Sequence, residues 1–361
     1  MSYFASIISI CLLVFTTRIL SKKYNILDKP NQYNDTKWRR PVPTLQGIFL
    51  YVIFIIIVAL FYPDLLVSQN FWYLSIFWLP LIVIWSLDDV YFTKIHIPTR
   101  SRFVLQIAVS VGIIFSADLW IESFRIWWQT IVFWYLWGKL LSLIWFILCI
   151  NAVNWFDGIN GQASWVSAIW FITVYYLISF VVFPTFTDMT DEYKYNLQLV
   201  QNLSLILTML AIVYAGIERK PWWLVRDPWT FFYWFTLAYL SLLAWAKIGT
   251  MLVVLSLVVF DALWVCTHRI FALKKAPRKG DYCHLHHRLL RLWWTKKEVN
   301  MFIWIWSIVM MILMLLQSDN RPSKIIIFVM MALLFFGINA YIFRIKKLPC
   351  GFSKQITPKK T

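Results

Sequence analysis

Apolar runs of about 18 to 25 residues recur along the whole chain, and no other feature restricts its fold as strongly. A helix of that length crosses a hydrocarbon layer about 30 Å thick. Hydrophobic residues make up 61% of the chain and charged residues 14%, whereas soluble domains are about 45–50% apolar. A soluble core cannot absorb this surplus, so we predict an all-α, polytopic integral membrane protein.

The hydropathy pattern predicts about eleven transmembrane helices. The candidate spans are 3–20, 47–67, 71–87, 103–119, 139–156, 163–183, 198–217, 230–246, 248–267, 299–316 and 324–343. The first span lacks a basic leader and a small-residue cleavage site, so we expect it to remain as an anchor. Because no internal repeat, low-complexity block or long linker divides the chain, residues 1–361 are expected to form a single transmembrane domain.

Lysine and arginine gather in alternate loops, and such loops are retained in the cytoplasm. The basic segments are 21–46, 88–102, 268–298 and the tail from Arg344, whereas loop 184–197 carries Asp188, Asp191 and Glu192. We therefore predict an N-terminus outside and a C-terminus inside the plasma (inner) membrane. The formal charge of +17 then lies mostly on the cytoplasmic face, where it suits anionic headgroups and acidic substrates more than nucleic acid.

Polar residues at the predicted cytoplasmic helix ends fall into four groups, and such residues beside a bilayer are costly unless they bind something. The first group is the pair Asp88-Asp89, followed in the chain by Arg102. Adjacent carboxylates repel each other, and a divalent cation relieves this repulsion while bridging to phosphate oxygens. The alternative is a solvated helix cap, which is a common role of Asp at a helix end.

The second group is the block Asn151-Ala-Val-Asn154-Trp-Phe-Asp157-Gly158-Ile-Asn160-Gly161, at the inner end of the fifth span. Asn151, Asn154 and, less directly, Asp157 recur at helical spacing and could share one face. The glycines allow a tight turn, so polar groups could converge on a nucleotide or a metal ion. Loop punctuation is the alternative, although regular Asn and Asp spacing beside a membrane core is unusual.

The third group is Asp227, which says little alone, and the fourth is Asp281-Tyr-Cys-His284-Leu-His286-His287-Arg288. Imidazoles among arginines and lysines suit contact with a pyrophosphate. A zinc site that includes Cys283 is one alternative, and the absence of a second cysteine ligand disfavours it. A solvated basic loop is the other alternative.

Taken in order, these groups resemble the polyprenyl-phosphate N-acetylhexosamine-1-phosphate transferase superfamily, also called glycosyltransferase family 4. The order of motifs carries the resemblance: a basic first loop with Asp28-Lys29-Pro30 and Arg40-Pro41-Val-Pro43, the Asp-Asp pair, the Asn-x-x-Asn-x-x-Asp-Gly-x-x-Gly block, the Asp227 segment and His-x-His-His. The segment His284-Leu-His286-His287-Arg288 is similar to the branch that transfers N-acetylglucosamine 1-phosphate for surface-polysaccharide or teichoic-acid synthesis. The phospho-MurNAc-pentapeptide transferase branch, which usually has three successive histidines, is the alternative.

The resemblance implies a reaction between a UDP-sugar and undecaprenyl phosphate that releases UMP and depends on Mg²⁺, with Mn²⁺ as a second candidate. It implies catalytic roles for Asp88, Asp89, Asp157 and Asp227, and metal ligation by Asp89, Asn154, Asp157 and Asp227. Substrate would be bound by Arg102, Asn151, Asn154, His284, His286, His287 and Arg288. The catalytic loops would lie near 21–46, 88–102, 151–162, 218–229 and 268–298. Membrane lipid is a further partner, and a homodimer is left open.

A transporter or flippase is the competing class, because many spans with polar groups inside the membrane are also typical of transporters. The acidic and histidine residues gather at one membrane face and no inverted repeat is visible, which favours the transferase.

Tryptophan stands at several positions where the resembling family has glycine or another small residue: Trp85, Trp165, Trp229, Trp234, Trp245 and Trp293. The chain has 23 Trp and only 10 Gly, whereas average usage would give about 25 Gly. We hypothesise that the organism decodes UGA as Gly and that the translation read these codons as Trp. Enrichment of Trp at membrane interfaces is the alternative, and genuine tryptophans would favour a degenerate scaffolding relative.

Overall fold

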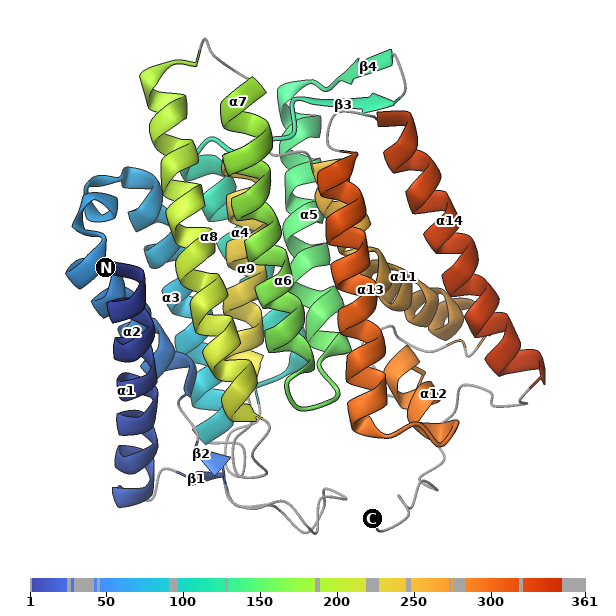
Figure 1. Cartoon of the computed structure of the whole chain (residues 1–361), viewed down its shortest axis with the longest axis horizontal. Coiled ribbons are helices and arrows are strands. Elements are labelled where there is room, and N and C mark those ends of the chain that lie inside the picture. The colour runs from blue at the N-terminus through green and yellow to red at the C-terminus, as the bar shows by residue number, and fades with distance from the viewer. Residues whose placement is uncertain are drawn as a thin grey trace.

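The computed structural model describes residues 2–24, 27–28, 42–43, 46–90, 97–126, 129–185, 189–218, 227–244, 248–272, 274, 283–317 and 321–345. These residues form a helical bundle with two small hairpins (Figure 1). In chain order the helices are α1 (Ser2–Lys23), α2 (Gln46–Phe61), α3 (Gln69–Val90), α4 (Thr99–Ser116), α5 (Tyr135–Phe156), α6 (Gln162–Leu177), α7 (Phe183–Thr185), α8 (Asp191–Glu218), α9 (Asp227–Leu243), α10 (Ile248–Val254), α11 (Ser256–Thr267), α12 (Leu285–Arg291), α13 (Lys296–Leu316) and α14 (Arg321–Ala340).

Short segments of other geometry complete these elements. A 3-10 turn, η1 (Pro63–Val67), joins α2 to α3, and π-helical turns are η2 (Ile178–Val182), η3 (His268–Ala272) and η4 (Tyr341–Ile345). Strands β1 (Leu27–Asp28) and β2 (Val42–Pro43) pair antiparallel, as do β3 (Ser123–Ile126) and β4 (Gln129–Val132). The all-α prediction is thus confirmed for the bundle, while the hairpins are small additions that hydropathy did not predict.

Each of the eleven predicted spans overlaps a helix, but the predicted number of membrane crossings is not confirmed. Among the described residues, six helices are long and apolar enough to cross a membrane, or seven if a bent pair counts as one span. The bent pair is α10 with α11 and its π-helical extension, which meet at 76°. The apolar stretches in α2 and α9 are shorter than 18 residues, which is about the length of helix that crosses a membrane.

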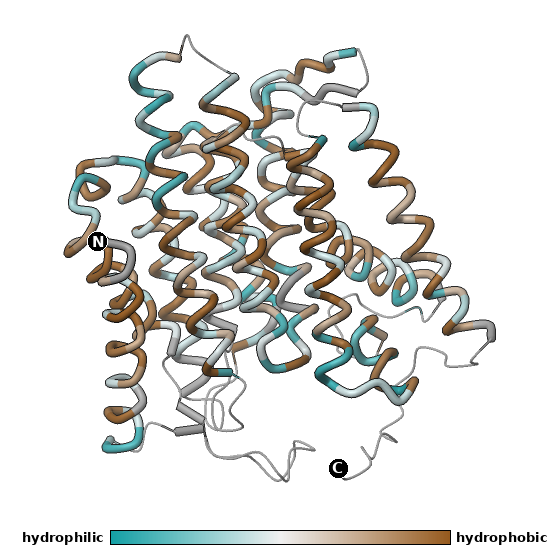
Figure 2. Tube along the Cα trace, viewed as in Figure 1, coloured by the Kyte–Doolittle hydropathy of each residue, from teal (hydrophilic) through white to brown (hydrophobic). Residues whose placement is uncertain are grey.

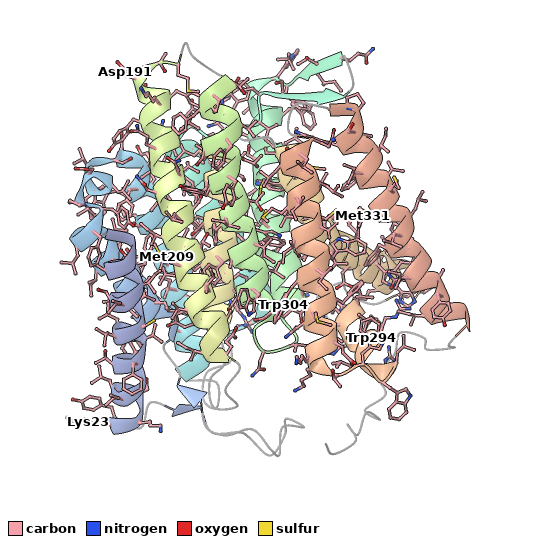
Figure 3. All side chains as sticks on the ribbon, in the orientation of Figure 1. Lys23, Asp191, Met209, Trp294, Trp304 and Met331 are labelled. Carbon is pink, nitrogen blue, oxygen red and sulfur yellow. The ribbon has the colours of Figure 1, made fainter. Side chains whose placement is uncertain are left out.

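The two ends of the bundle differ in charge. Hydrophobic residues occupy the middle of most helices and hydrophilic residues gather toward the ends (Figure 2). Helix α1 ends on Lys22 and Lys23, whereas α8 begins with Asp191 and Glu192, and Lys23 and Asp191 lie at opposite ends (Figure 3). This arrangement matches the charge split between loops in the sequence. Which end faces the cytoplasm remains a prediction.

The centre of the bundle is formed by α5, α6, α8 and α9, in which α6 packs against α8 and α5 against α9. Large aromatic side chains fill this centre, and the rings of Trp170 and Trp234 meet edge to face with centroids 3.8 Å apart. Inside a bilayer such contacts stabilise the bundle through van der Waals packing between helices and not through removal of side chains from water. The packing therefore fixes where the ends of these central helices lie.

Several segments predicted as catalytic loops are in part helical, and for residues 151–156 this agrees with the predicted span 139–156. Arg102 lies in the first turn of α4, and residues 151–156 complete α5. The predicted loop 268–298 contains η3 and α12 and runs into the start of α13. Helix ends are set by packing as well as by local sequence, so boundaries read from hydropathy alone shift by several residues.

Candidate functional site

The turn between α5 and α6 holds the centre of the Asn-x-x-Asn-x-x-Asp-Gly block. Helix α5 ends at Phe156, so Asp157 follows the helix and does not extend the face of Asn151. Gly161 then takes φ +80°, a left-handed conformation that glycine adopts without strain, and begins α6. The block thus forms the tight turn that its glycines predict.

This turn is tied to two other helices. Asn300 of α13 donates from Nδ2 to the carbonyl oxygen of Asn160 at 3.0 Å. On the other side, Asn160 Nδ2 donates to the carbonyl of Glu218, the last residue of α8, at 3.4 Å, and Ser164 donates to the Glu218 carboxylate at 2.8 Å. The turn that carries Asp157 is therefore held by long-range hydrogen bonds and not by local ones alone.

Gly158 brings the histidine segment against this turn. A Cβ atom placed on Gly158 would lie 1.9 Å from Nε2 of His286, so only a residue without a side chain permits the approach. The His286 ring also meets the ring of Phe156 edge to face, with centroids 6.0 Å apart. The second and fourth groups predicted from the sequence are thus direct neighbours.

The start of α9 also contacts the turn between α5 and α6. Thr230, three positions after Asp227, donates from Oγ1 to the Oδ2 atom of Asp157 at 3.2 Å. The next residue, Phe231, packs against Trp85 of α3 with ring centroids 4.5 Å apart. Since Asp88 and Asp89 follow Trp85 in the last turn of α3, the backbone of all four predicted groups comes together at one end of the bundle, which we call the motif end.

Other predicted site residues lie outside the described part of the structure. Helices α3, α5 and α9 include the backbone of Asp88, Asp89, Asn154 and Asp227, but nothing is described of their side chains. The first basic loop is described only at β1 and β2, and Asp281 is outside as well. Of the suspect tryptophans, the side chain of Trp229 and the whole of Trp245 are also not described.

The histidine segment opens α12 and is anchored by a carboxylate from another helix. His284 Nδ1 lies 2.8 Å from Oδ2 of Asp261 in α11, and the backbone N–H of Leu285 donates to Oδ1 of the same carboxylate at 2.8 Å. The His284 and His286 rings are nearly parallel at 8°, with centroids 5.7 Å apart, and His287 lies 4.1 Å from His286. Three imidazoles therefore form one cluster beside Gly158.

His286 is buried, with 1% of its surface exposed, and its environment favours the neutral ring. Burial is the main cause that lowers its pKa well below the ordinary value, and the neighbouring His287 and His284 add to this effect. Neither ring nitrogen has a hydrogen-bond partner among the residues that the structure describes. A neutral imidazole has one donor and one acceptor nitrogen, so His286 can hydrogen-bond a ligand oxygen.

Three further residues predicted to bind substrate lie in three different helices: Arg102 in α4, Asn151 in α5 and Arg288 in α12. Asn151 donates from Nδ2 to Gln106 of α4 at 2.9 Å, and Arg102 lies one turn before Gln106 on the same helix. Arg288 is fully buried, and its two terminal nitrogens donate to the side-chain and backbone oxygens of Asn339 in α14. The guanidinium of Arg288 thus links α12 to α14, and its predicted contact with a pyrophosphate remains a prediction.

Two acidic residues near the motif end belong to none of the four groups predicted from the sequence. Asp261 is the single charged residue in the apolar stretch of α11, and Glu218 ends the apolar helix α8 with 2% of its surface exposed. An ionisable residue inside a span is expensive and marks a functional or structural interaction. This rule, applied to every span and not only to the loops, could have found Asp261.

The residue types predicted as metal ligands, carboxylates and an amide, suit Mg²⁺ better than Zn²⁺, and the metal site stays a prediction. Asp157, Asp89 and Asp227 offer carboxylates and Asn154 an amide oxygen, and hard divalent cations prefer such ligands. No group of three His, Cys, Asp or Glu side chains within the described ranges could hold a metal ion. The zinc alternative at Cys283 gains no support, because among the described residues Cys283 belongs to no such group of three.

Comparison with known proteins adds an independent line of argument. Residues 71–234 match the profile of the family described as Glycosyl transferase family 4. A probable undecaprenyl-phosphate N-acetylglucosaminyl 1-phosphate transferase of Bacillus subtilis (strain 168) is 24% identical over 226 residues, which cover 58% of this chain and 55% of the relative. The match thus spans about half the length of that curated relative.

The matched residues run from α3 into α9 and include Asp88, Asp89, Asp157 and Asp227. The histidine segment lies beyond this range, and the structure brings it to the same end through the contact between His286 and Gly158. The part of the chain that carries the first three predicted groups therefore matches the model of glycosyl transferase family 4, the superfamily that the motif order resembles.

Proposed function

We propose that this protein transfers a sugar 1-phosphate from a UDP-sugar to undecaprenyl phosphate and releases UMP. The observation that supports this most strongly is the meeting of four polar segments at one end of an apolar bundle. A water-soluble nucleotide sugar and a phosphate anchored in lipid can reach the same place only at such an end. The name of the Bacillus relative favours N-acetylglucosamine 1-phosphate as the transferred group.

In this reaction an oxygen of the lipid phosphate forms a bond to the phosphorus that carries the sugar. The bond from that phosphorus to the bridging oxygen breaks, and UMP leaves with the bridging oxygen and its electron pair. No oxidant or reductant is needed. Negative charge spreads over the phosphoryl oxygens, so the protein must supply positive charge and hydrogen-bond donors around them.

His286 can supply a hydrogen-bond donor at the motif end, and a bound metal ion would supply the positive charge. His286, kept neutral by burial, can donate one hydrogen bond to a diphosphate oxygen without bringing a desolvated charge. We propose Asp89, Asn154, Asp157 and Asp227 as the residues that hold Mg²⁺, which when bound offsets the charge of the phosphates. Thr230 holds one oxygen of Asp157, which fixes the orientation of that carboxylate.

The direct test uses the purified full chain with undecaprenyl phosphate, Mg²⁺ and a panel of labelled UDP-sugars that includes UDP-N-acetylglucosamine and UDP-MurNAc-pentapeptide. We expect labelled sugar to enter the lipid phase in step with UMP release. Chelation by EDTA should abolish transfer, and restored Mg²⁺ should recover it. Absence of a lipid product with every sugar, from protein that retains its thermal unfolding transition, would refute the proposal.

Asp157→Asn tests the site itself. Because the change removes a charge from the proposed metal site, we expect turnover to fall about 100-fold or more. Asp191→Asn is the matched control, since Asp191 is exposed at the opposite end of the bundle and its loss should leave turnover unchanged. Equal turnover of the two variants would show that Asp157 has no part in the reaction.

A further inference from the structure

Asp261 is a buried carboxylate that none of the predicted motifs includes. It lies in α11, the second half of the bent pair, with 1% of its surface exposed among buried apolar neighbours such as Phe260 and Ala262. Burying an ionised carboxylate costs several kcal/mol unless hydrogen bonds compensate. Its presence in this position therefore requires partners that the fold supplies.

Both oxygens of Asp261 are engaged by the start of the histidine segment. Oδ1 accepts the backbone N–H of Leu285 at 2.8 Å, and Oδ2 lies 2.8 Å from His284 Nδ1. Leu285 is the first residue of α12, and its N–H is among those that a helix cannot satisfy internally. His284, at the N-cap, makes no capping hydrogen bond with its own side chain. Asp261, which belongs to the separate helix α11, thus accepts the hydrogen bond that a capping side chain of α12 would otherwise accept.

The same contact fixes the chemistry of the His284 ring. An ionised carboxylate only accepts hydrogen bonds, so Nδ1 of His284 carries the hydrogen and donates it to Asp261. In the neutral ring Nε2 is then the acceptor, and in the charged ring it becomes a second donor. One carboxylate therefore decides which ring nitrogen of His284 is left for a ligand.

The effect extends to His286. The His284 ring stacks parallel to the His286 ring. Nε2 of His286 lies close to Gly158, the residue after Asp157. If the start of α12 turned or shifted, both rings would move relative to the α5–α6 turn. A displacement of about 1 Å in a positioning residue can reduce turnover on the order of 100-fold.

We propose that Asp261 is the positioning residue of the imidazole cluster, which holds His284 as the Nδ1–H form and sets His286 against the α5–α6 turn for contact with the diphosphate. This inference rests on the proposed transfer reaction for its consequence, but the hydrogen bond itself can be tested without activity. Asp261 does not touch the reacting groups in this view. It acts through His284.

The first experiment measures the tautomer directly. The chain has five histidines, so nitrogen-15 labelled histidine gives few ring signals, and His284→Gln assigns the signal of interest. We expect His284 in the full chain to carry its hydrogen on Nδ1, and Asp261→Asn to move it to Nε2, because the amide group can donate to Nδ1. An Nε2–H form in the unaltered chain would overturn the proposal whether or not transfer is detected.

The second experiment is a double-mutant cycle on kcat/KM for transfer. Asp261→Asn should lower kcat/KM about 10- to 100-fold, as expected for an outer residue that orients a ligand-binding imidazole. Adding Asp261→Asn to His284→Gln should cause no further loss, because both changes remove the same interaction. The proposal would be contradicted if the kcat/KM losses of the two single variants multiplied in the double variant, or if Asp261→Asn alone left kcat/KM unchanged.

Asp118→Asn serves as the matched control for both experiments. It breaks a hydrogen-bonded ion pair with Lys139, 2.6 Å long, at the end of the bundle that carries β3 and β4. We expect its turnover and its His284 tautomer to equal those of the unaltered chain. If the unaltered chain makes no lipid-linked sugar, the transfer proposal fails, and the tautomer measurement still decides the role of Asp261.

Discussion

At the scale of single residues, Gly158 is the position where the Asn-x-x-Asn-x-x-Asp-Gly block meets the histidine segment. A methyl group there would overlap the His286 ring, so the ring or the turn must shift. We expect Gly158→Ala to cost about 1–3 kcal/mol in the free energy of unfolding and to lower turnover on the order of 100-fold. Thermal unfolding in detergent and the transfer assay measure the two effects.

Gly216→Ala is the control for this change. Gly216 lies inside α8, where an added Cβ would meet nothing within 4 Å, so alanine should leave turnover unchanged. Helix propensity predicts a small gain in stability, about 0.5–1 kcal/mol. If both alanine variants behaved alike, the approach of His286 to Gly158 would not matter for the reaction.

Among the suspect tryptophans that the structure describes, Trp293 is the one whose backbone favours glycine. It follows α12 with φ +69°, a region that side chains rarely adopt. Its N–H donates to the carbonyl of Leu290 and that of Trp294 to Leu289, which is the helix-ending motif that usually has glycine at this position. The indole is 78% exposed and adds little packing. We expect Trp293→Gly to raise the free energy of unfolding by about 1 kcal/mol.

Trp294→Gly is the comparison, because Trp294 packs edge to face against Phe302 and does not have a positive φ. This variant should lose stability. Equal losses in both variants would argue against a glycine position at residue 293. The codons decide the underlying hypothesis: UGG at positions 165, 229 and 293 would defeat the UGA reading, whereas UGA there would support it.

At the scale of elements, α12 is a short helix held from two sides. Asp261 of α11 binds its start, and Asn339 of α14 accepts hydrogen bonds from Arg288 near its end. Seven residues are too few for a stable isolated helix. The orientation of the imidazole cluster therefore depends on α11 and α14 and not on the local sequence of α12.

Asn339→Ala tests this dependence. The change removes one acceptor of a buried guanidinium, and we expect a loss of about 1–3 kcal/mol in the free energy of unfolding. Turnover should also fall, because α12 carries His286. Gln198→Ala, which removes an exposed amide from α8, should change neither property. Unchanged thermal unfolding of Asn339→Ala would show that Arg288 has other sufficient partners.

At the scale of the whole molecule, the motif end must face the compartment that supplies the nucleotide sugar. The positive-inside pattern predicts that this end is cytoplasmic and that the end with Asp191 is outside. In cells that express single-cysteine variants, a membrane-impermeant maleimide should label Thr190→Cys but not Lys297→Cys until the membrane is opened. Thr190 and Lys297 are both exposed. The reverse labelling would place the motif end outside and exclude a cytoplasmic UDP-sugar as substrate.

The sequence predicted where helices form more reliably than where they end. The long apolar run of α13 gives its helix directly, because a lipid environment leaves the backbone no other way to satisfy its hydrogen bonds. Helix α8 starts at Asp191, seven residues before the predicted span 198–217, whereas the predicted span 139–156 ends at Phe156, where α5 ends. The stop depends on the contacts of the following turn with Glu218 and Asn300, which lie far away in the chain.

By itself the sequence determined the apolar helices, the charge asymmetry of their ends and the order of motifs by which residues 71–234 match a family model, because span length, charge and motif spacing are all local properties. Only the tertiary structure decided that Asp261 anchors His284, that His286 lies against Gly158 and that Thr230 holds Asp157. These contacts join separate helices, and the packing of the bundle, including the bend between α10 and α11, sets their distances.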